Sequence, residues 1–331
     1  MDRKTNGVQQ YYQEIRNRLK NYIKSDYLAN SETLLLYADD ILGNDCNDDI
    51  NIAREPYIET SSSYKKVIDG IKIAEIPENV REVLLKLANA NLGIYSTPFE
   101  HQVKALTGAL DGKDLFVSTG TGSGKTECFL WPIIAREVEE ALDRPKDFSL
   151  PAVRTLIIYP MNALVSDQLA RFRKIMGSEE FIKIFTTSLG TERIPHFGMY
   201  TGRTPYSGES KKQSNIQLAE TFRAQYLINA SPSEKEIQKR RIEGFKSINK
   251  YPVRYGGDAG LKIFIENLEK GIHNPGPLDA EYITRFEIQQ NTPDILITNY
   301  SMLEYMLMRQ LEAGIWDNTK KWLEKSEDNR L

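Results

Sequence analysis

The sequence contains the stretch Thr119-Gly120-Thr121-Gly122-Ser123-Gly124-Lys125-Thr126, a glycine-rich loop that ends in lysine and threonine. An apolar run at 114–119 (DLFVST) precedes the lysine, and a helical pattern at 126–142 (TECFLWPIIAREVEEAL) follows it. Glycines permit left-handed backbone angles that turn successive N–H groups inward, and the start of a helix adds further free N–H groups. Strand, loop and helix together predict a phosphate-binding loop in an α/β domain.

Two side chains of this loop suit a nucleotide with its metal ion. Lys125 supplies a mobile cation for the β- and γ-phosphates, and the Thr126 hydroxyl suits Mg²⁺. The strict pattern begins with glycine where this chain has Thr119, so the match is to a relaxed form. The alternative is a glycine-rich turn that binds nothing. The residues predicted to hold the phosphates are Gly120, Thr121, Gly122, Ser123, Gly124, Lys125 and Thr126, the last of which also holds the metal.

Apolar, β-branched runs alternate with helical patterns along the rest of the domain. Further runs lie at 155–160 (TLIIYP), 196–202 (HFGMYTG) and 295–298 (ILIT). This alternation predicts a parallel sheet with crossover helices. The stretch 203–290 breaks the rhythm, and we expect it to be a mostly helical insertion.

The N-terminal stretch 1–95 is predicted to be a helical extension, separate from an ATP-binding domain at 96–331. Apolar residues between 8 and 30 recur every three or four positions, which predicts an amphipathic helix, and 43–63 is polar and turn-rich like a linker. A second helical pattern follows at 78–90. The pattern gives no function for the extension.

Composition excludes several classes of protein. Lys and Arg total 43 against 46 Asp and Glu, so no global positive field marks a nucleic-acid binder and such a site must be local. The two cysteines, Cys46 and Cys128, suggest neither a disulfide framework nor a zinc site. In the absence of such a framework we expect the reducing cytoplasm. The longest apolar run is far shorter than a membrane span, so we expect no membrane partner.

A glutamine upstream of the loop introduces a family resemblance. Gln102, in TPFEHQ (97–102), lies about twenty residues before the lysine of TGTGSGKTE, as in superfamily 2 helicases of the DEAD/DEAH-box type. The resemblance implies a RecA-like P-loop domain that binds ATP and Mg²⁺, with Gln102 reading the adenine edge through its amide. The alternative is a solvent-facing glutamine on an ordinary helix.

Two further segments resemble nucleic-acid-binding motifs of the same helicases. The segment 159–168 (YPMNALVSDQ) is similar to motif Ia, and 292–303 (TPDILITNYSML) is similar to motifs Ib to Ic. The residues of these two segments, together with YTGRTP (200–205), resemble those of large prokaryotic helicases of the RecQ-like Hrq group, some of which belong to phage-defence systems. The resemblance favours DNA over RNA. It implies contacts to the nucleic-acid backbone from Asn162, Ala163, Gln168, Thr298, Asn299 and Ser301, although Asn162 is also suited to an ordinary helix start.

Hydrolysis requires an acidic motif at the end of a strand, and no apolar strand after the loop ends in such a pair. Glu139-Glu140 lies on the loop helix, Glu179-Glu180 has no preceding strand, and Asp294 precedes its strand. The resemblance also implies a second RecA-like domain with an arginine finger, which this sequence lacks. We therefore expect the N-terminal part of a larger or split helicase, incomplete for hydrolysis alone, whose partners are the missing half or other defence-system subunits.

Two functions remain open at this point. The first is an ATP-dependent helicase or translocase, an ATP hydrolase that binds ATP–Mg²⁺ at the loop and nucleic acid at the motif segments. The second is a non-hydrolysing, ATP-binding regulatory or interaction module. Gln102 together with the two motif segments favours the first, because a generic ATP switch needs none of them.

The insertion contains a basic stretch at 235–262 with eight cations against three acids. Phe245, Tyr251 and Tyr255 lie among the cations, so the stretch is suited to binding an unpaired strand. A solvated amphipathic helix with Ile237, Arg241 and Phe245 on one face is an equal alternative.

Overall fold

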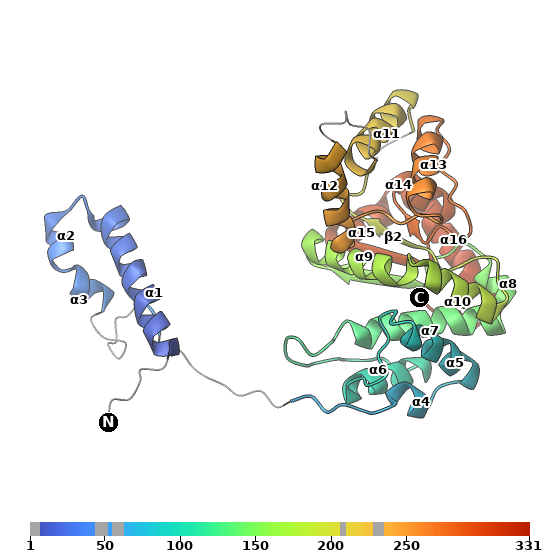
Figure 1. Ribbon diagram of the computed structural model, residues 1–331, viewed down its shortest axis with the longest axis horizontal. Coiled ribbons are helices and arrows are strands. Elements are labelled where there is room, and N and C mark those ends of the chain that lie inside the picture. Colours follow the sequence, from blue (N-terminus) through green and yellow to red (C-terminus); the bar gives the residue numbers. More distant parts are fainter. Residues whose placement is uncertain (1–6, 44–51, 55–62, 206–209, 228–234) are drawn as a thin grey trace. The chain divides into compact units, whose positions relative to one another are not determined.

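The computed structural model describes residues 7–43, 52–54, 63–205, 210–227 and 235–331. The chain forms two compact units, Met1–Ser63 and Tyr64–Leu331 (Figure 1). The predicted boundary at 95/96 differs from this division, because residues 64–95 belong to the same unit as the glycine-rich loop.

The described part of the N-terminal unit is mostly helical. Helix α1 (Gly7–Ile23) continues into a π-helical turn (Lys24–Leu28), and α2 (Glu32–Leu36) and α3 (Ala38–Leu42) follow. The predicted helix is confirmed, but its apolar stripe is largely exposed within this unit. Its buried side chains are Arg16 and Lys20, which both donate to the carbonyl oxygen of Gly43. Most of the predicted linker, including Cys46, lies outside the described residues.

The second unit is built on a parallel sheet of four strands in the order β1-β4-β2-β3. The strands are β1 (Thr155–Tyr159), β2 (Phe197–Tyr200), β3 (Glu281–Tyr282) and β4 (Ile295–Asn299). Successive residues of β4 face opposite sides: Ile295 and Ile297 pack in one apolar cluster, and Leu296 in another. The sheet is therefore covered on both faces, and the predicted α/β class is confirmed.

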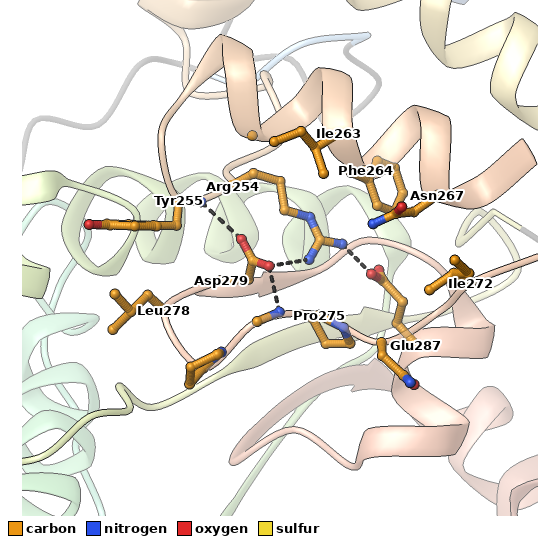
Figure 2. A pocket seen from close by; sticks show the side chains of 14 residues that line it. Arg254, Tyr255, Ile263, Phe264, Asn267, Ile272, Pro275, Leu278, Asp279 and Glu287 are labelled. Carbon is orange, nitrogen blue, oxygen red and sulfur yellow. Dashed lines mark hydrogen bonds and ion pairs between the residues drawn. The ribbon is translucent and has the colours of Figure 1, made fainter. Parts of the chain in front are cut away.

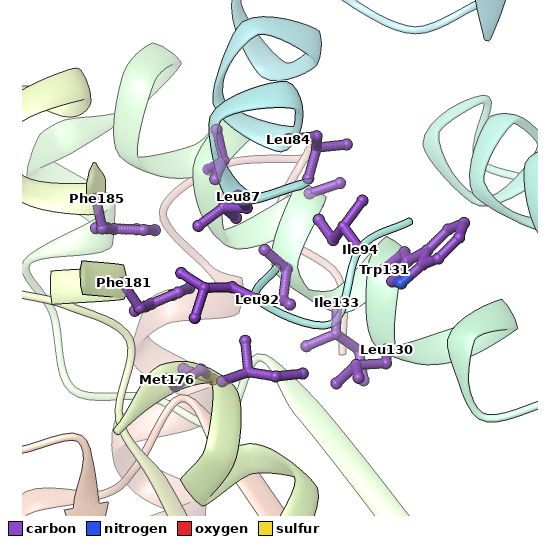
Figure 3. Close-up of a cluster of buried hydrophobic side chains, with 14 of the residues drawn as sticks. Leu84, Leu87, Leu92, Ile94, Leu130, Trp131, Ile133, Met176, Phe181 and Phe185 are labelled. Carbon is purple, nitrogen blue, oxygen red and sulfur yellow. The ribbon is translucent and has the colours of Figure 1, made fainter. Parts of the chain in front are cut away.

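Helices cover the two faces of the sheet. The first cluster, part of which is shown in Figure 3, joins the sheet to residues of α5, α7, α9 and α10, and the second joins it to α14, α15 and α16. The helices of this unit are α4 (Gly70–Ile73), α5 (Glu78–Asn89), α6 (Glu100–Leu110), α7 (Glu127–Asp143), α8 (Pro145–Phe148), α9 (Asn162–Met176), α10 (Glu179–Leu189), α11 (Lys212–Tyr226), α12 (Lys235–Ser247), α13 (Asp258–Glu269), α14 (Arg285–Asn291), α15 (Tyr300–Met308) and α16 (Ala313–Leu323), with a 3-10 turn at Gln310–Glu312.

One predicted strand is wrong. Residues 114–119, which lead into the glycine-rich loop, have no strand partner in the part of the chain that the structure describes. Phe116 in this run is 95% exposed. A β-strand requires hydrogen bonds to a neighbouring strand. The four described strands of the sheet pair only with one another, so residues 114–119 have no partner among them.

The insertion is mostly helical, as predicted, but it also supplies a strand. Helices α11, α12 and α13 share a separate apolar cluster, whereas β3 pairs with β2 in the main sheet. Phe245 and Tyr251 pack in or against that cluster and are therefore not free stacking platforms. The helical face predicted for the basic stretch is also wrong in part, since Ile237 is exposed and Ile242 is buried in its place.

A buried ionic network lies at the amino ends of three strands. Arg154, next to β1, donates to Asp294 Oδ1 at 2.7 Å and to both carboxylate oxygens of Glu140 on α7 at 2.8 and 3.0 Å. Asp294, next to β4, also pairs with Arg193 and accepts from the backbone N–H of His196 at 2.6 Å. Burial favours the neutral acid, but Arg193 and Arg154 outweigh it and hold the pKa of Asp294 below its usual value.

We predict that Asp294→Ala lowers the free energy of unfolding by about 3–5 kcal/mol, because it leaves Arg154 and Arg193 without their shared counter-ion. The matched control is Asp167→Ala, which removes an exposed acid on α9 and should change stability by less than about 0.5 kcal/mol. Urea unfolding of the two variants measures both values. Equal effects would show that the network does not hold the strands.

Candidate nucleotide and nucleic-acid site

The glycine-rich loop has the backbone that an anion cradle requires. Gly122 and Gly124 adopt left-handed φ angles of 75° and 73°, and α7 begins directly after the loop at Glu127. No backbone N–H group of 121–126 donates to an acceptor within the described residues. The hydroxyls of Thr119 and Ser123 lie 2.6 Å apart and close the loop across its base. The free N–H groups and the helix start offer a site for an anion.

Lys125 and Thr126 are both accessible at the loop. Lys125 Nζ donates to the carbonyl oxygens of Thr119 and Gly120 at 2.6 and 2.8 Å, so its ammonium lies against the mouth of the loop. Thr126 is the residue before α7, and its side chain makes no capping hydrogen bond. The cation and the hydroxyl are therefore available to phosphate oxygens and to a metal ion.

Gln102 connects helix α6 to the loop. The side chain is 2% exposed, its Oε1 accepts from the Phe99 N–H at 2.8 Å, and its Nε2 donates to the Gly124 carbonyl at 3.1 Å. Any Cβ at position 124 would lie 2.3 Å from Gln102 Nε2, so this contact requires glycine there. The oxygen and the nitrogen of the Gln102 amide are both hydrogen-bonded to the backbone in this structure. Contact with adenine would require these two hydrogen bonds to break.

Two aromatic residues beside the loop were not predicted. The sequence pattern assigns no role to His101. In the structure, its Nε2 lies 2.8 Å from the Ser123 carbonyl oxygen. Its ring packs against Tyr64 with centroids 5.4 Å apart, and the Tyr64 hydroxyl lies 2.7 Å from where a Cβ would stand on Gly120. Tyr64 is distant from the loop in sequence, so no local pattern identifies it.

An ion pair links the loop helix to α9. Glu127 Oε1 accepts from Arg171 Nη1 at 3.2 Å, while Glu127 Oε2 is buried without a partner among the described residues. The neighbouring Cys128 is buried, and burial raises the pKa of its thiol, which keeps it a neutral packing group.

The carboxyl ends of β1 and β4 bring the two predicted nucleic-acid segments together. Tyr159 is the register partner of Asn299, so the residues that follow both strands share one edge of the sheet. Asn299 Nδ2 donates to Asn162 Oδ1 at 2.6 Å, and Asn299 Oδ1 caps α15 by accepting from the Met302 N–H at 2.8 Å. The predicted residues Ala163 and Ser301 are exposed beside this pair.

Two predicted nucleic-acid residues face inward in this structure. Thr298 is buried, and its hydroxyl donates to the Tyr200 carbonyl at 2.6 Å. Gln168 is buried on α9, with no partner for its Oε1 within the described residues. Their contacts to nucleic acid stay predictions.

Arg203 is an exposed cation that the sequence prediction missed. It follows β2, whose last residue, Tyr200, is the register partner of Thr298, so it belongs to the same edge of the sheet. The Thr201 hydroxyl accepts from its backbone N–H at 3.2 Å and orders the turn. A cation three residues after the end of a parallel strand, in YTGRTP, was the available signal.

Carboxylates are absent from the carboxyl ends of the strands that the structure describes. β1, β2, β3 and β4 end in Tyr, Tyr, Tyr and Asn. Glu140 and Asp294 lie in the buried ionic network, and Glu179 begins α10. Within the described residues there is no cluster of three metal-ligating side chains and no helix long and apolar enough to cross a membrane.

A glycine-rich loop before a helix, in a parallel α/β unit, is typical of phosphate-binding-loop proteins. Comparison with known sequences narrows this class. Residues 99–228 match the DEAD/DEAH box helicase family. The chain is 38% identical over 343 residues to the Druantia protein DruE of Escherichia coli, an alignment that covers 98% of this chain and 18% of that protein. The chain therefore carries a DEAD/DEAH box helicase domain of superfamily 2.

Other relatives are similar over shorter stretches. A probable ATP-dependent RNA helicase, ddx27 of Dictyostelium discoideum, is 34% identical over 36% of this chain and 15% of its own length. The ATP-dependent DNA helicase hus2/rqh1 of Schizosaccharomyces pombe is 34% identical over 23% of this chain and 5% of its own length. The chain spans less than a fifth of each of these relatives, DruE included. No solved structure matches this chain.

Proposed function

We propose that this chain is the ATP-binding and strand-binding N-terminal part of an ATP-dependent nucleic-acid helicase or translocase. The observation that carries the proposal is the set of free loop N–H groups at the start of α7, with Lys125 at the mouth of the loop. The membership of the domain in the DEAD/DEAH box helicases supports it.

In this proposal the loop holds ATP with Mg²⁺. The N–H groups of 121–126 and the ammonium of Lys125 bind the phosphates, and the Thr126 hydroxyl contacts the metal. Arrival of the triphosphate draws Lys125 away from the carbonyls of Thr119 and Gly120, because phosphate oxygens carry the larger negative charge.

The nucleic-acid strand lies across the carboxyl edge of the sheet. Asn162 and Asn299 offer amide groups there, and the first turn of α9 offers free N–H groups because Met161, the residue before the helix, provides no side-chain cap. Arg203 adds a cation for the backbone phosphates. We propose DNA as the polymer, the second helicase half or other defence-system subunits as partners, and the cytoplasm as the location.

A second candidate is favoured by one observation. The described strands carry no carboxylate at their carboxyl ends, where a water-activating acid is needed. This chain by itself is therefore suited to act as an ATP-binding module that does not hydrolyse its nucleotide.

We predict that Lys125→Ala abolishes measurable ATP binding, because it removes the cation that faces the β- and γ-phosphates. Gln102→Ala should instead remove the preference for ATP over GTP, since its amide is the group suited to the adenine edge. Calorimetry with both nucleotides measures the two effects. The control is Lys146→Ala, which removes an exposed lysine outside the loop. Unchanged ATP affinity in Lys125→Ala would contradict the assignment.

We also predict that the chain alone hydrolyses ATP near the background rate at saturating nucleic acid. The reason is that no carboxylate among the described strand ends can orient the attacking water. Steady-state phosphate release tests this, and addition of a segment with the acidic motif and second RecA-like domain should restore turnover. Strand-stimulated hydrolysis by this chain alone would place the catalytic acids elsewhere.

A further inference from the structure

The proposed strand-binding edge also carries exposed apolar side chains. Tyr300 is 63% exposed and Met161 is 59% exposed. Each is the sequence neighbour of one member of the Asn162–Asn299 hydrogen bond. Their shared position beside one polar pair, rather than their exposure alone, makes this edge a candidate interaction site.

Helix α15 directs Tyr300 away from the sheet. Met306 is buried in the apolar cluster on that face of the sheet, and Met302 packs against the same cluster one turn earlier. Residue 300 lies roughly opposite these two on the helix, given about 100° per residue. Neither the ring nor the hydroxyl of Tyr300 has a partner within the described residues. Its position is therefore set by the helix, while its ring remains free.

Met161 occupies a position where a polar residue is usual. It precedes α9 in extended conformation, with φ −133° and ψ 143°, and makes no side-chain hydrogen bond to the helix. Ser, Thr, Asp or Asn at this position would satisfy a free N–H group of the first turn. Methionine leaves that N–H group available and places a flexible apolar side chain at the edge.

The polar and apolar groups of this edge match different parts of a nucleic-acid strand. Arg203 and the free N–H groups of α9 suit phosphates, and the Asn162–Asn299 pair offers neutral polar contacts. An aromatic ring and a thioether suit the faces of bases, which are accessible only where the bases are unpaired. A regular duplex would present phosphates and groove edges to the same surface.

We propose that Tyr300, with Met161 beside it in the site, stacks on bases of a single-stranded nucleic acid held at the carboxyl edge of the sheet. This inference rests on the proposed function and adds to it a base contact through Tyr300, which is independent of sequence because every base offers a face. Tyr300 therefore contacts the bases of the strand, and Arg203 contacts its phosphates.

The experiment compares a thymidine strand with a strand of equal length that has abasic sites in place of its bases. Fluorescence anisotropy measures the affinity of the chain for both. Tyr300→Ala should weaken binding of the thymidine strand roughly 5- to 150-fold, the range expected for one base stack, and leave the abasic strand unchanged. Tyr300→Phe should retain the affinity of the native chain, because the ring and not the hydroxyl makes the contact.

Two variants serve as matched controls. Leu307→Ala alters a side chain on the same helix that is 64% exposed, and it should change neither affinity. Arg203→Gln should weaken both strands equally and flatten the dependence of log affinity on log salt by about 0.7, the value for one lost phosphate contact on a single strand.

Three outcomes overturn the inference. An equal loss on both strands in Tyr300→Ala, or no loss on either, contradicts stacking while the proposed strand-binding function stands. Failure of the native chain to bind either strand contradicts the proposed function itself, and the stacking inference with it.

Discussion

The ion pairs of Arg154 with Asp294 and Glu140 fix the frame on which the site depends. Asp294, next to β4, pairs with Arg154 before β1, and it also binds Arg193 and the His196 N–H before β2. Glu140 holds Arg154 to α7. The network fixes the register of β1, β4 and β2 at their amino ends. Since the strands are parallel and of similar length, their carboxyl ends then align, which places Asn299 within reach of Asn162.

A continuous set of contacts connects this frame to the glycine-rich loop. Gln102 fixes the Gly124 carbonyl at the turn into α7, and Glu127 at the start of α7 pairs with Arg171 on α9. Helix α9 begins at Asn162, which is bonded to the end of β4. Helices α7 and α9 thus link the glycine-rich loop to the proposed strand edge. A change in the loop on nucleotide binding would therefore reach the edge through these packed and paired groups.

The sequence was most informative where local chemistry decides the structure. The glycines of the loop, the start of α7 and the strands at 155–159, 197–200 and 295–299 follow from residue type and spacing. The strand predicted at 114–119 failed because pairing depends on a neighbour that local sequence does not specify. Tyr64 and the Glu127–Arg171 pair were missed because long-range packing brings them to the loop. Thr298 is buried because β4 lies between β1 and β2 and apolar clusters cover both of its faces.

The proposed path of the nucleic-acid strand crosses the carboxyl edge of β1, β2 and β4. Photocross-linking of a bound strand that contains 5-iodouridine, followed by mass spectrometry of the attached peptides, tests it most directly. We expect adducts in the peptides that contain Met161 and Tyr300, with Phe245 and Tyr251 unlabelled because they pack in the insertion. Adducts confined to the basic stretch 235–262, with none after β1 or β4, would contradict it.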